Sequence, residues 1–356
     1  MAKIKAEIIG IGSYIPKKIV PNTYFLDWEF YDANGKLDTP NEIIIEKFKA
    51  ITGIEERRWL DDDMVASDMA VIAAQRALDD SGINPDDLDY IIAATNFGDV
   101  EKDNYFSDFM PAVASRIKHR LKLANPKAIA FDVIFGCPGW LQALIMANQF
   151  MKSGDAKYAM IVGVEALSRV VDPFDRDAMI FADGAGVVII KLNTEENGNG
   201  ILSYKTVSHA HPQAELLYND QSFNPDYNPN AKFIRMQGHK IYEYALNEVP
   251  AAMKAAMDES GYEIDDLKKV FIHQANEKMD EQIVKRFYRL YKKQMPEHIM
   301  PMNINKLGNS SVATIPTLMD MVRRGDLKNH ELNKGDLILL ASVGAGMNIN
   351  AVVMKY

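Results

Sequence analysis

The chain has 356 residues, of which 47% are hydrophobic and 25% are charged, a composition typical of a globular α/β protein with one large or two ordinary domains. The net charge of −9 argues against broad binding to nucleic-acid phosphates, and no uncharged run is long enough to cross a membrane. A single cysteine excludes an internal disulfide framework and any multi-cysteine metal site, so we expect a cytoplasmic protein.

The first 20 residues are an apolar stretch broken by glycine and proline, which predicts a first strand and turn and not a secretory signal. Gly10 and Gly12 lack the third glycine and the following helix of a dinucleotide-binding motif. Further along the chain, His209 and His211 have no evident third metal ligand. We therefore expect neither a bound cofactor nor a metal.

Two segments about half the chain apart resemble each other. Residues 77–88 end an amphipathic helix and precede the apolar run 90–94, and residues 256–267 do the same before the apolar run 270–273. A helix–turn–strand unit that recurs in this way predicts an internal duplication. Chance similarity of two such units is the alternative.

A second correspondence follows in the same order in both halves. A short turn rich in small residues opens a predicted helix, and an apolar strand follows that helix. The turn, helix and strand occupy residues 136–139, 140–152 and 158–164 in the first copy and 308–311, 313–323 and 337–343 in the second. Strands that alternate with helices predict a mostly parallel sheet in each half, covered by helices on both faces.

The polar stretch at residues 193–200 marks the join between the two halves, because a composition shift of this kind is typical of a linker. We therefore predict an N-terminal half, residues 1–195, that carries the cysteine, and a C-terminal half, residues 196–356. The two halves are expected to pack face to face.

The lone Cys137 lies where a predicted strand ends and a helix begins. A helix N-terminus offers unpaired N–H groups and a partial positive charge, which favour a thiolate, so Cys137 is either a nucleophile or a buried structural cysteine. His273 follows an apolar run, at the strand end where α/β folds place ligand-facing residues, although a buried structural histidine fits as well. Asn309 lies in the turn that mirrors Cys137 across the repeat. Pseudo-symmetry would bring the three residues into one pocket.

These residues resemble the motifs of the β-ketoacyl-acyl carrier protein synthase III family, within the thiolase superfamily. Residues 131–140 are similar to the family's nucleophile segment, residues 273–276 to its histidine motif and residues 308–311 to its asparagine motif. Further matches lie at residues 172–176, 181–186 and 342–346. All of these motifs occur in the family's order along the chain.

The resemblance implies a five-layer αβαβα fold made of two duplicated halves, and a homodimer. It implies that Cys137 attacks an acyl thioester, with its backbone N–H and that of Ala345 forming the oxyanion hole. His273 and Asn309 would hold the carbonyl of malonyl-acyl carrier protein while CO₂ leaves, and the carbanion would attack the acyl-Cys137 ester. The implied activity is a decarboxylative Claisen condensation that gives a 3-oxoacyl product, in fatty acid initiation or a related polyketide, polyene or secondary lipid pathway.

Two rival interpretations come from other classes. One is a catalytically silent subunit that pairs with an active condensing partner, and the other is an enzyme that only transfers or hydrolyses the acyl group. Degradative thiolases need a second active-site cysteine, which this chain lacks. The presence of Cys137, His273 and Asn309 together favours the condensing enzyme.

The resemblance also implies roles for residues around the catalytic set. Arg169 and Asn276 would contact the substrate, and Met110 would reach across the dimer to form the floor of the partner's acyl pocket. Three basic residues would dock the acidic acyl carrier protein: Lys278, Lys285 and Arg286. A solvated charged face is the other interpretation of this basic group.

One departure from the family concerns the acyl primer. The family's tryptophan that stacks on the adenine of CoA has no counterpart in residues 39–46, and apparent insertions lie at residues 28–36 and 98–109. We therefore expect the primer to arrive on a carrier protein, or on an unusual donor, in preference to acyl-CoA. An adenine contact from an aromatic residue of the first insertion, such as Trp28, is the alternative.

Overall fold

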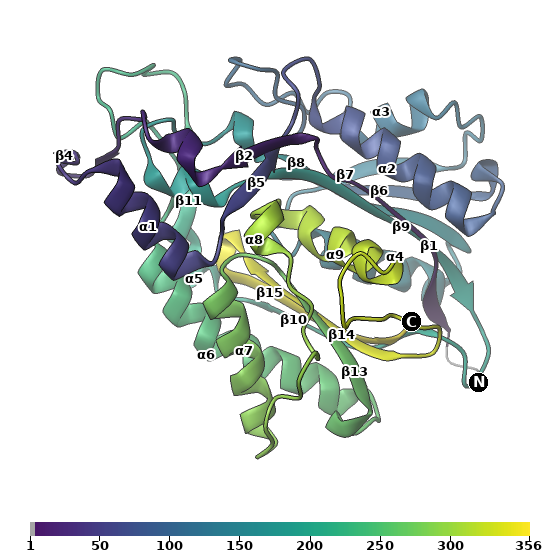
Figure 1. Ribbon diagram of the computed structural model, residues 1–356. Helices are drawn as coiled ribbons and strands as arrows, with labels where there is room; N and C mark the ends of the chain where they lie inside the picture. The colour runs from purple at the N-terminus through teal and green to yellow at the C-terminus, as the bar shows by residue number, and fades with distance from the viewer. Residues whose placement is uncertain (1–3) are drawn as a thin grey trace.

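The computed structural model describes residues 4–356, so residues 1–3 of the predicted N-terminal half lie outside the described residues. The described residues form two main sheets. The first sheet has the strand order β1-β9-β8-β6-β7 and the second the order β10-β15-β14-β13 (Figure 1). The first contains β1 (Lys5–Tyr14), β6 (Tyr90–Ala94), β7 (Ile129–Val133), β8 (Tyr158–Ala166) and β9 (Asp183–Asn193). The second contains β10 (Gly200–Ser208), β13 (Leu267–Ile272), β14 (Leu337–Gly344) and β15 (Asn348–Lys355).

The strand directions repeat between the sheets. In the first sheet β9 runs antiparallel to β1 and β8, and β6 runs parallel to β8 and β7. In the second sheet β15 runs antiparallel to β10 and β14, and β13 runs parallel to β14. Parallel pairing is thus confined to part of each sheet, and the prediction of mostly parallel sheets was too strong.

Helices cover and separate the two sheets in five layers (Figure 1). The outer face of the first sheet is covered by α2 (Ala66–Ser81) and α3 (Val113–Arg120). Between the sheets lie α4 (Gly139–Ser153) and α9 (Thr314–Arg323), each in contact with strands of both. The outer face of the second sheet is covered by α6 (Gly238–Glu259), with α7 (Glu277–Leu290) beside it.

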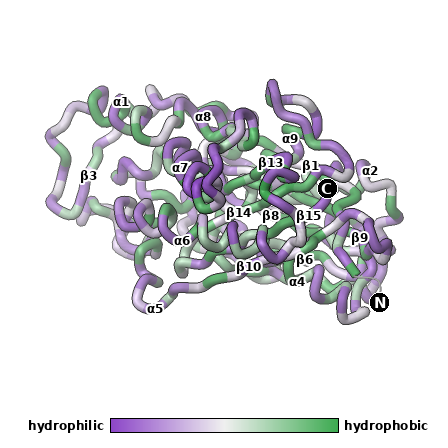
Figure 2. Tube along the Cα trace, turned by 90° about the horizontal axis from the view of Figure 1, so that it is seen from below, coloured by the Kyte–Doolittle hydropathy of each residue, from purple (hydrophilic) through white to green (hydrophobic). Residues whose placement is uncertain are grey.

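Burial explains why these segments fold as they do. Nearly every residue of β8 and all of β14 are buried, and their almost continuous apolar sequences are typical of strands covered on both faces. In contrast, α7 buries one stripe that includes Ile283 and Phe287 and turns charged residues outward. Figure 2 shows this separation as hydrophobic central strands and hydrophilic turns of α7.

Short antiparallel strand pairs and three further α-helices complete the part of the structure that residues 4–356 describe. Three antiparallel pairs are β2 (Lys18–Pro21) with β5 (Glu56–Trp59), β3 (Tyr31–Asp32) with β4 (Gly35–Lys36), and β11 (Leu217–Asp220) with β12 (Phe233–Met236). The other helices described are α1 (Asn41–Thr52), α5 (Ala210–Gln213) and α8 (Ile304–Leu307). The β3–β4 pair occupies the first predicted insertion.

Candidate active site

Cys137 lies in the turn between β7 and α4, and this turn packs against the residues that follow β14. A Cβ atom on Gly136 would lie 2.6 Å from the backbone N of Ala345, and one on Gly344 would lie 2.5 Å from the backbone N of Cys137. Gly136 also has a φ of +66°, a conformation that glycine adopts without strain. The two glycines therefore let the two halves meet backbone to backbone beside the cysteine.

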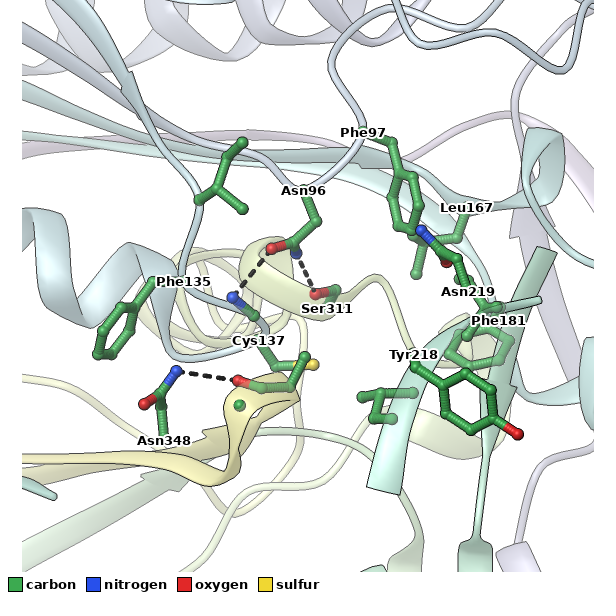
Figure 3. Close-up of a pocket in the computed structure, with 16 residues that line it drawn as sticks. Asn96, Phe97, Phe135, Cys137, Leu167, Phe181, Tyr218, Asn219, Ser311 and Asn348 are labelled. Atoms are coloured by element: carbon green, nitrogen blue, oxygen red, sulfur yellow. Dashed lines mark hydrogen bonds between the residues drawn. The ribbon is translucent and has the colours of Figure 1, made fainter. Parts of the chain in front are cut away.

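A cavity of about 350 Å³ lies beside Cys137 (Figure 3). Asn96, Ser311 and Asn348 contribute polar groups to its wall. Most of the remaining wall is apolar and includes Phe97, Leu167, Phe181, Leu217, Tyr218 and Ile234. An apolar cavity that ends at a thiol is suited to an acyl chain.

The Cys137 thiol carries its proton at rest. Burial raises its pKa to about 11, while the Ser311 hydroxyl acts in the opposite direction and the carboxyl of Glu165 adds to the increase. Burial of the sulfur therefore acts against the thiolate that a helix N-terminus would favour. The proton has to leave the sulfur during the attack on a substrate.

His273 directly follows β13 and is 3% exposed. Its Nδ1 lies 2.8 Å from Thr314 Oγ1, which lies 2.9 Å from the backbone O of Ser311, so the single hydroxyl proton of Thr314 has two available acceptors. Because Nδ1 is engaged, Nε2 is the ring nitrogen that remains for a substrate. Burial lowers the pKa of His273 to about 4, so the imidazole is neutral at pH 7.

Asn309 lies in the turn between α8 and α9. Its Oδ1 accepts a hydrogen bond from the backbone N of Ser311 over 2.8 Å, so the NH₂ group is the part of the side chain that remains to donate. Its backbone N donates to Ile180 O, and its backbone O accepts from Ala182 N, both over 2.9 Å. These bonds fasten the asparagine turn of the second half to the first half.

Ser311 is the residue around which the predicted catalytic side chains gather. Its backbone N binds Asn309, its backbone O binds Thr314 and through it His273, and the residue lines the cavity together with Cys137. Ser311 has a φ of +51°, which is uncommon for a residue other than glycine and typical of functional sites. The structure thus brings Cys137, His273 and Asn309 into one neighbourhood.

Asn96 and Glu165 are two polar residues close to Cys137 that the sequence motifs did not indicate. Asn96 lies two residues beyond β6 and lines the cavity, and Glu165 is fully buried near the end of β8. Burial raises the pKa of Glu165 to about 8. A signal was available, since each residue follows an apolar run that predicts a strand, and strand ends of α/β sheets are where ligands bind.

Of the predicted site residues, Cys137 and Ala345 line the cavity, whereas His273, Asn309 and the predicted substrate contacts Met110, Arg169 and Asn276 do not. Met110 is 88% exposed, in the segment between β6 and α3. Arg169 is 8% exposed, and its Nη2 donates to the backbone O of Asp61 over 2.8 Å. The side chain of Asn276 caps α7 by accepting from Met279 N over 3.0 Å. Their roles toward a substrate stay predictions.

The predicted basic face on α7 is partly engaged within the protein. Lys278 is exposed, whereas Lys285 pairs with Glu281 over 2.7 Å. Arg286 donates from Nη1 to the backbone O of Leu246 over 3.0 Å, which ties α7 to α6. Lys278 is therefore the most available cation of this group.

Residues 4–356 contain neither a candidate membrane span nor a candidate metal cluster. Within this range no helix is both long and apolar enough to cross a bilayer. Nor do these residues contain a group of three or more His, Cys, Asp or Glu side chains that could hold a metal. The ring of His209 instead meets a tyrosine, with Nδ1 3.0 Å from Tyr244 OH.

Known proteins are similar in sequence to this chain over nearly their whole length. The β-ketoacyl-[acyl-carrier-protein] synthase III of Staphylococcus aureus (strain JH1) is 33% identical over 350 residues, which cover 98% of this chain and 98% of that protein. The chain belongs to the β-ketoacyl-[acyl-carrier-protein] synthase III family. Models of the 3-oxoacyl-[acyl-carrier-protein] synthase III family and of its C-terminal part match residues 131–210 and 257–356. These ranges include Cys137, His273 and Asn309.

Solved structures of the synthase III family have the same fold. The enzyme from Aquifex aeolicus VF5 is 29% identical with a TM-score of 0.79, and the comparison covers 99% of this chain and 100% of that one. The enzyme from Thermus thermophilus is 29% identical with a TM-score of 0.80, covering 98% and 99%. The predicted family and the five-layer thiolase-like fold are confirmed.

Proposed function

We propose that this synthase III family member joins an acyl group to malonyl-acyl carrier protein by decarboxylative Claisen condensation, through an acyl-Cys137 intermediate. The observation that carries the proposal is the gathering of Cys137, His273 and Asn309 around Ser311, beside an apolar cavity. The product is a 3-oxoacyl thioester, and the pathway is fatty acid initiation or a related lipid or polyketide synthesis.

In the first half-reaction the sulfur of Cys137 bonds to the carbonyl carbon of an acyl thioester, and the bond from that carbon to the donor's sulfur breaks. The proton of the thiol has to reach the departing thiolate, because burial raises the Cys137 pKa to about 11. His273 is neutral at pH 7 and is suited to carry that proton. The N–H groups of Cys137 and Ala345 are the proposed oxyanion hole, and the close approach of Gly136 to Ala345 supports this placement.

In the second half-reaction the bond between the malonyl carboxylate and the α carbon breaks, CO₂ leaves, and the electron pair forms an enolate. The Asn309 NH₂ group would donate to the enolate oxygen, and His273 Nε2 would donate in the tautomer in which Nδ1 accepts from the Thr314 hydroxyl and the ring proton lies on Nε2. The engagement of His273 Nδ1 by Thr314 and of Asn309 Oδ1 by Ser311 supports this assignment. The enolate carbon then bonds to the acyl carbon, and the sulfur of Cys137 leaves and takes up the one proton from solvent that the loss of CO₂ requires.

We infer that the acyl primer arrives on a carrier protein, or on an unusual donor, in preference to CoA. Arg169 is buried against the backbone of Asp61. Aromatic residues of the first insertion pack inward, since the Trp28 ring lies 4.7 Å from that of Phe25 and Phe30 is 2% exposed. A lost ring–ring contact is worth about 0.5–1.5 kcal/mol, so CoA donors would still react, but several-fold less well.

A homodimer is the proposed assembly, and the cytoplasm is the proposed location. β7 is the outer strand of the first sheet, and it begins with Ile129, which is 51% exposed. Ile134, Phe106 and Met110 add exposed apolar surface at 64%, 68% and 88%. An exposed edge strand with apolar residues nearby is typical of a surface that pairs with another chain. Met110 would then enter the partner's acyl cavity.

Intact-protein mass spectrometry tests the proposal. Acetyl and octanoyl groups would be offered on CoA and on acyl carrier protein, and the rate of acyl mass gain would be measured for each donor. We expect one acyl group on the wild-type protein, none on Cys137→Ala, and faster transfer from the carrier protein. An unchanged mass gain in Cys137→Ala would contradict the nucleophile, and acetyl-CoA as the best donor would contradict the primer assignment.

A further inference from the structure

Asn96 links the nucleophile turn to the asparagine turn across the wall of the cavity (Figure 3). Its Oδ1 accepts a hydrogen bond from the backbone N of Gly136 over 2.9 Å, and its Nδ2 lies 3.4 Å from Ser311 Oγ. Gly136 directly precedes Cys137, and the Ser311 hydroxyl is the hydrogen-bond partner that lowers the pKa of Cys137. One carboxamide therefore contacts the neighbours of the nucleophile in both halves.

Glu165 determines which way the Asn96 carboxamide points. Its Oε1 accepts from the backbone N and from Nδ2 of Asn96, each over 2.7 Å. An oxygen that accepts two hydrogen bonds favours the NH₂ side of an amide, so the Asn96 oxygen turns toward Gly136. Glu165 is 0% exposed, and a buried carboxyl is costly unless its hydrogen bonds are made.

We propose that Asn96 and Glu165 are positioning residues for the acylation of Cys137. Glu165 orients the Asn96 carboxamide, and Asn96 holds Gly136 and Ser311 where the sulfur and the backbone N–H of Cys137 are aligned for attack. This inference rests on the proposed acylation half-reaction. In this proposal the carboxyl of Glu165, which is outside the Cys-His-Asn set, fixes the position of the Cys137 turn relative to the Asn309 turn.

The charge state of Glu165 gives this arrangement a pH signature. Burial raises its pKa to about 8, hydrogen bonds from Asn96 and Thr95 act in the opposite direction, and the carboxyl of Asp183 adds to the increase. The titratable groups that face Glu165 are Asp183 on β9 and the thiol of Cys137. As the pH rises through about 8, Glu165 becomes negative and the thiol becomes harder to ionise.

Three variants separate the parts of this contact. Asn96→Ala removes both side-chain bonds, and Asn96→Asp keeps an acceptor for Gly136 but sets a second carboxylate against Glu165. Glu165→Gln keeps an oxygen that accepts both Asn96 bonds and removes the charge. The control is Asn34→Ala, because Asn34 is exposed in the β3–β4 turn.

Two readouts are measured on each variant: kcat and KM for Cys137 acylation, and the thiol pKa from the pH dependence of iodoacetamide alkylation. We expect Asn96→Ala to lower kcat on the order of 100-fold with KM unchanged, since misplaced reacting groups cost about that much. Asn96→Asp should raise the thiol pKa, and Glu165→Gln should lower it. Asn34→Ala should match the wild type.

The results distinguish a failure of the Asn96–Glu165 positioning role from a failure of the proposed condensing function. Wild-type kcat in Asn96→Ala would overturn the positioning role, and an unmoved thiol pKa in Glu165→Gln would overturn the charge coupling between Glu165 and Cys137. If Asn96→Ala does not fold, judged by circular dichroism, the Asp and Gln variants decide between the same two outcomes. A wild-type protein that accepts no acyl group would overturn the proposed function instead, and the alkylation profiles would still test the Asn96–Glu165 contact.

Discussion

The strands β1-β9-β8-β6 of the first half follow the same order and directions as β10-β15-β14-β13 of the second. Beyond β6 the first sheet continues with β7, whereas the second sheet, within residues 4–356, ends at β13. The chain leaves β7 almost directly into Cys137, but it reaches Asn309 through the short helix α8. The two copies of one unit thus differ at the edge where the site lies.

This difference shows how a duplicated fold divides its chemistry. The half with the additional strand carries the proposed nucleophile and has β7 as an outer strand, at the edge where we propose that a second subunit pairs. The half without it sends the Asn309 turn across to the first half, where it bonds to Ile180 and Ala182. The proposed hydrogen-bond donors, His273 and Asn309, both come from this second half.

The largest expected effect comes from removing the two proposed hydrogen-bond donors of the second half, which distinguishes its role from that of the first half. His273→Ala and Asn309→Ala should lower the rate of malonyl decarboxylation roughly 100- to 1000-fold, because each loses a donor to the enolate. Acylation of Cys137 should persist more in Asn309→Ala than in His273→Ala, since His273 is also the proposed proton carrier. Release of CO₂ from malonyl-acyl carrier protein and acyl mass gain measure the two steps. Near-normal condensation in both variants would refute the mechanism.

A second change disrupts the seam between the halves. Gly136→Ala should lower Cys137 acylation on the order of 100-fold, because its Cβ would lie 2.6 Å from Ala345 N and displace an oxyanion donor. Gly82 is the matched control, with a φ of +67° and nothing within 4 Å of an added Cβ. Gly82→Ala should cost only about 1–2 kcal/mol of backbone strain, with activity retained. Equal acylation rates in the two variants would show that the close approach of Gly136 to Ala345 is not needed for acylation.

The smallest expected effect concerns the exposed face of α7, where Lys278 is proposed to dock the acyl carrier protein. Lys278→Glu should raise KM for malonyl-acyl carrier protein by up to about fivefold at low salt and less at moderate salt, as for a single exposed charge pair. Lys328→Glu is the control, an exposed lysine on a different segment. If both variants respond alike, the effect comes from net charge and not from docking on α7.

Much of the fold followed from patterns within short segments. The predicted helix at 140–152 is observed as Gly139–Ser153, and the predicted strand at 337–343 as Leu337–Gly344. Both segments carry a long buried apolar pattern, which fixes the element type without any knowledge of its neighbours. The repeat then placed Cys137 and Asn309 in corresponding turns.

The properties that depend on packing between segments could not be predicted. The helix position of Cys137 favoured a thiolate, but the burial that raises its pKa arises only when both halves close around it. Asn96 and Glu165 are far apart in the sequence, and their contact depends on the pairing of β6 with β8. The engagement of Arg286 by α6 likewise has no sequence signal.

The chain holds a single sulfhydryl group, and that group is kept protonated. Peroxide and similar oxidants attack the thiolate, so a cysteine that loses its proton only during substrate attack is spared between turnovers. The enzyme has no second cysteine with which a sulfenic acid could condense to a disulfide within the chain. The raised pKa of Cys137, a residue that lines the cavity, thus lowers its reactivity toward oxidants between turnovers, and the same raised pKa is why the proposed mechanism needs a proton carrier in every cycle.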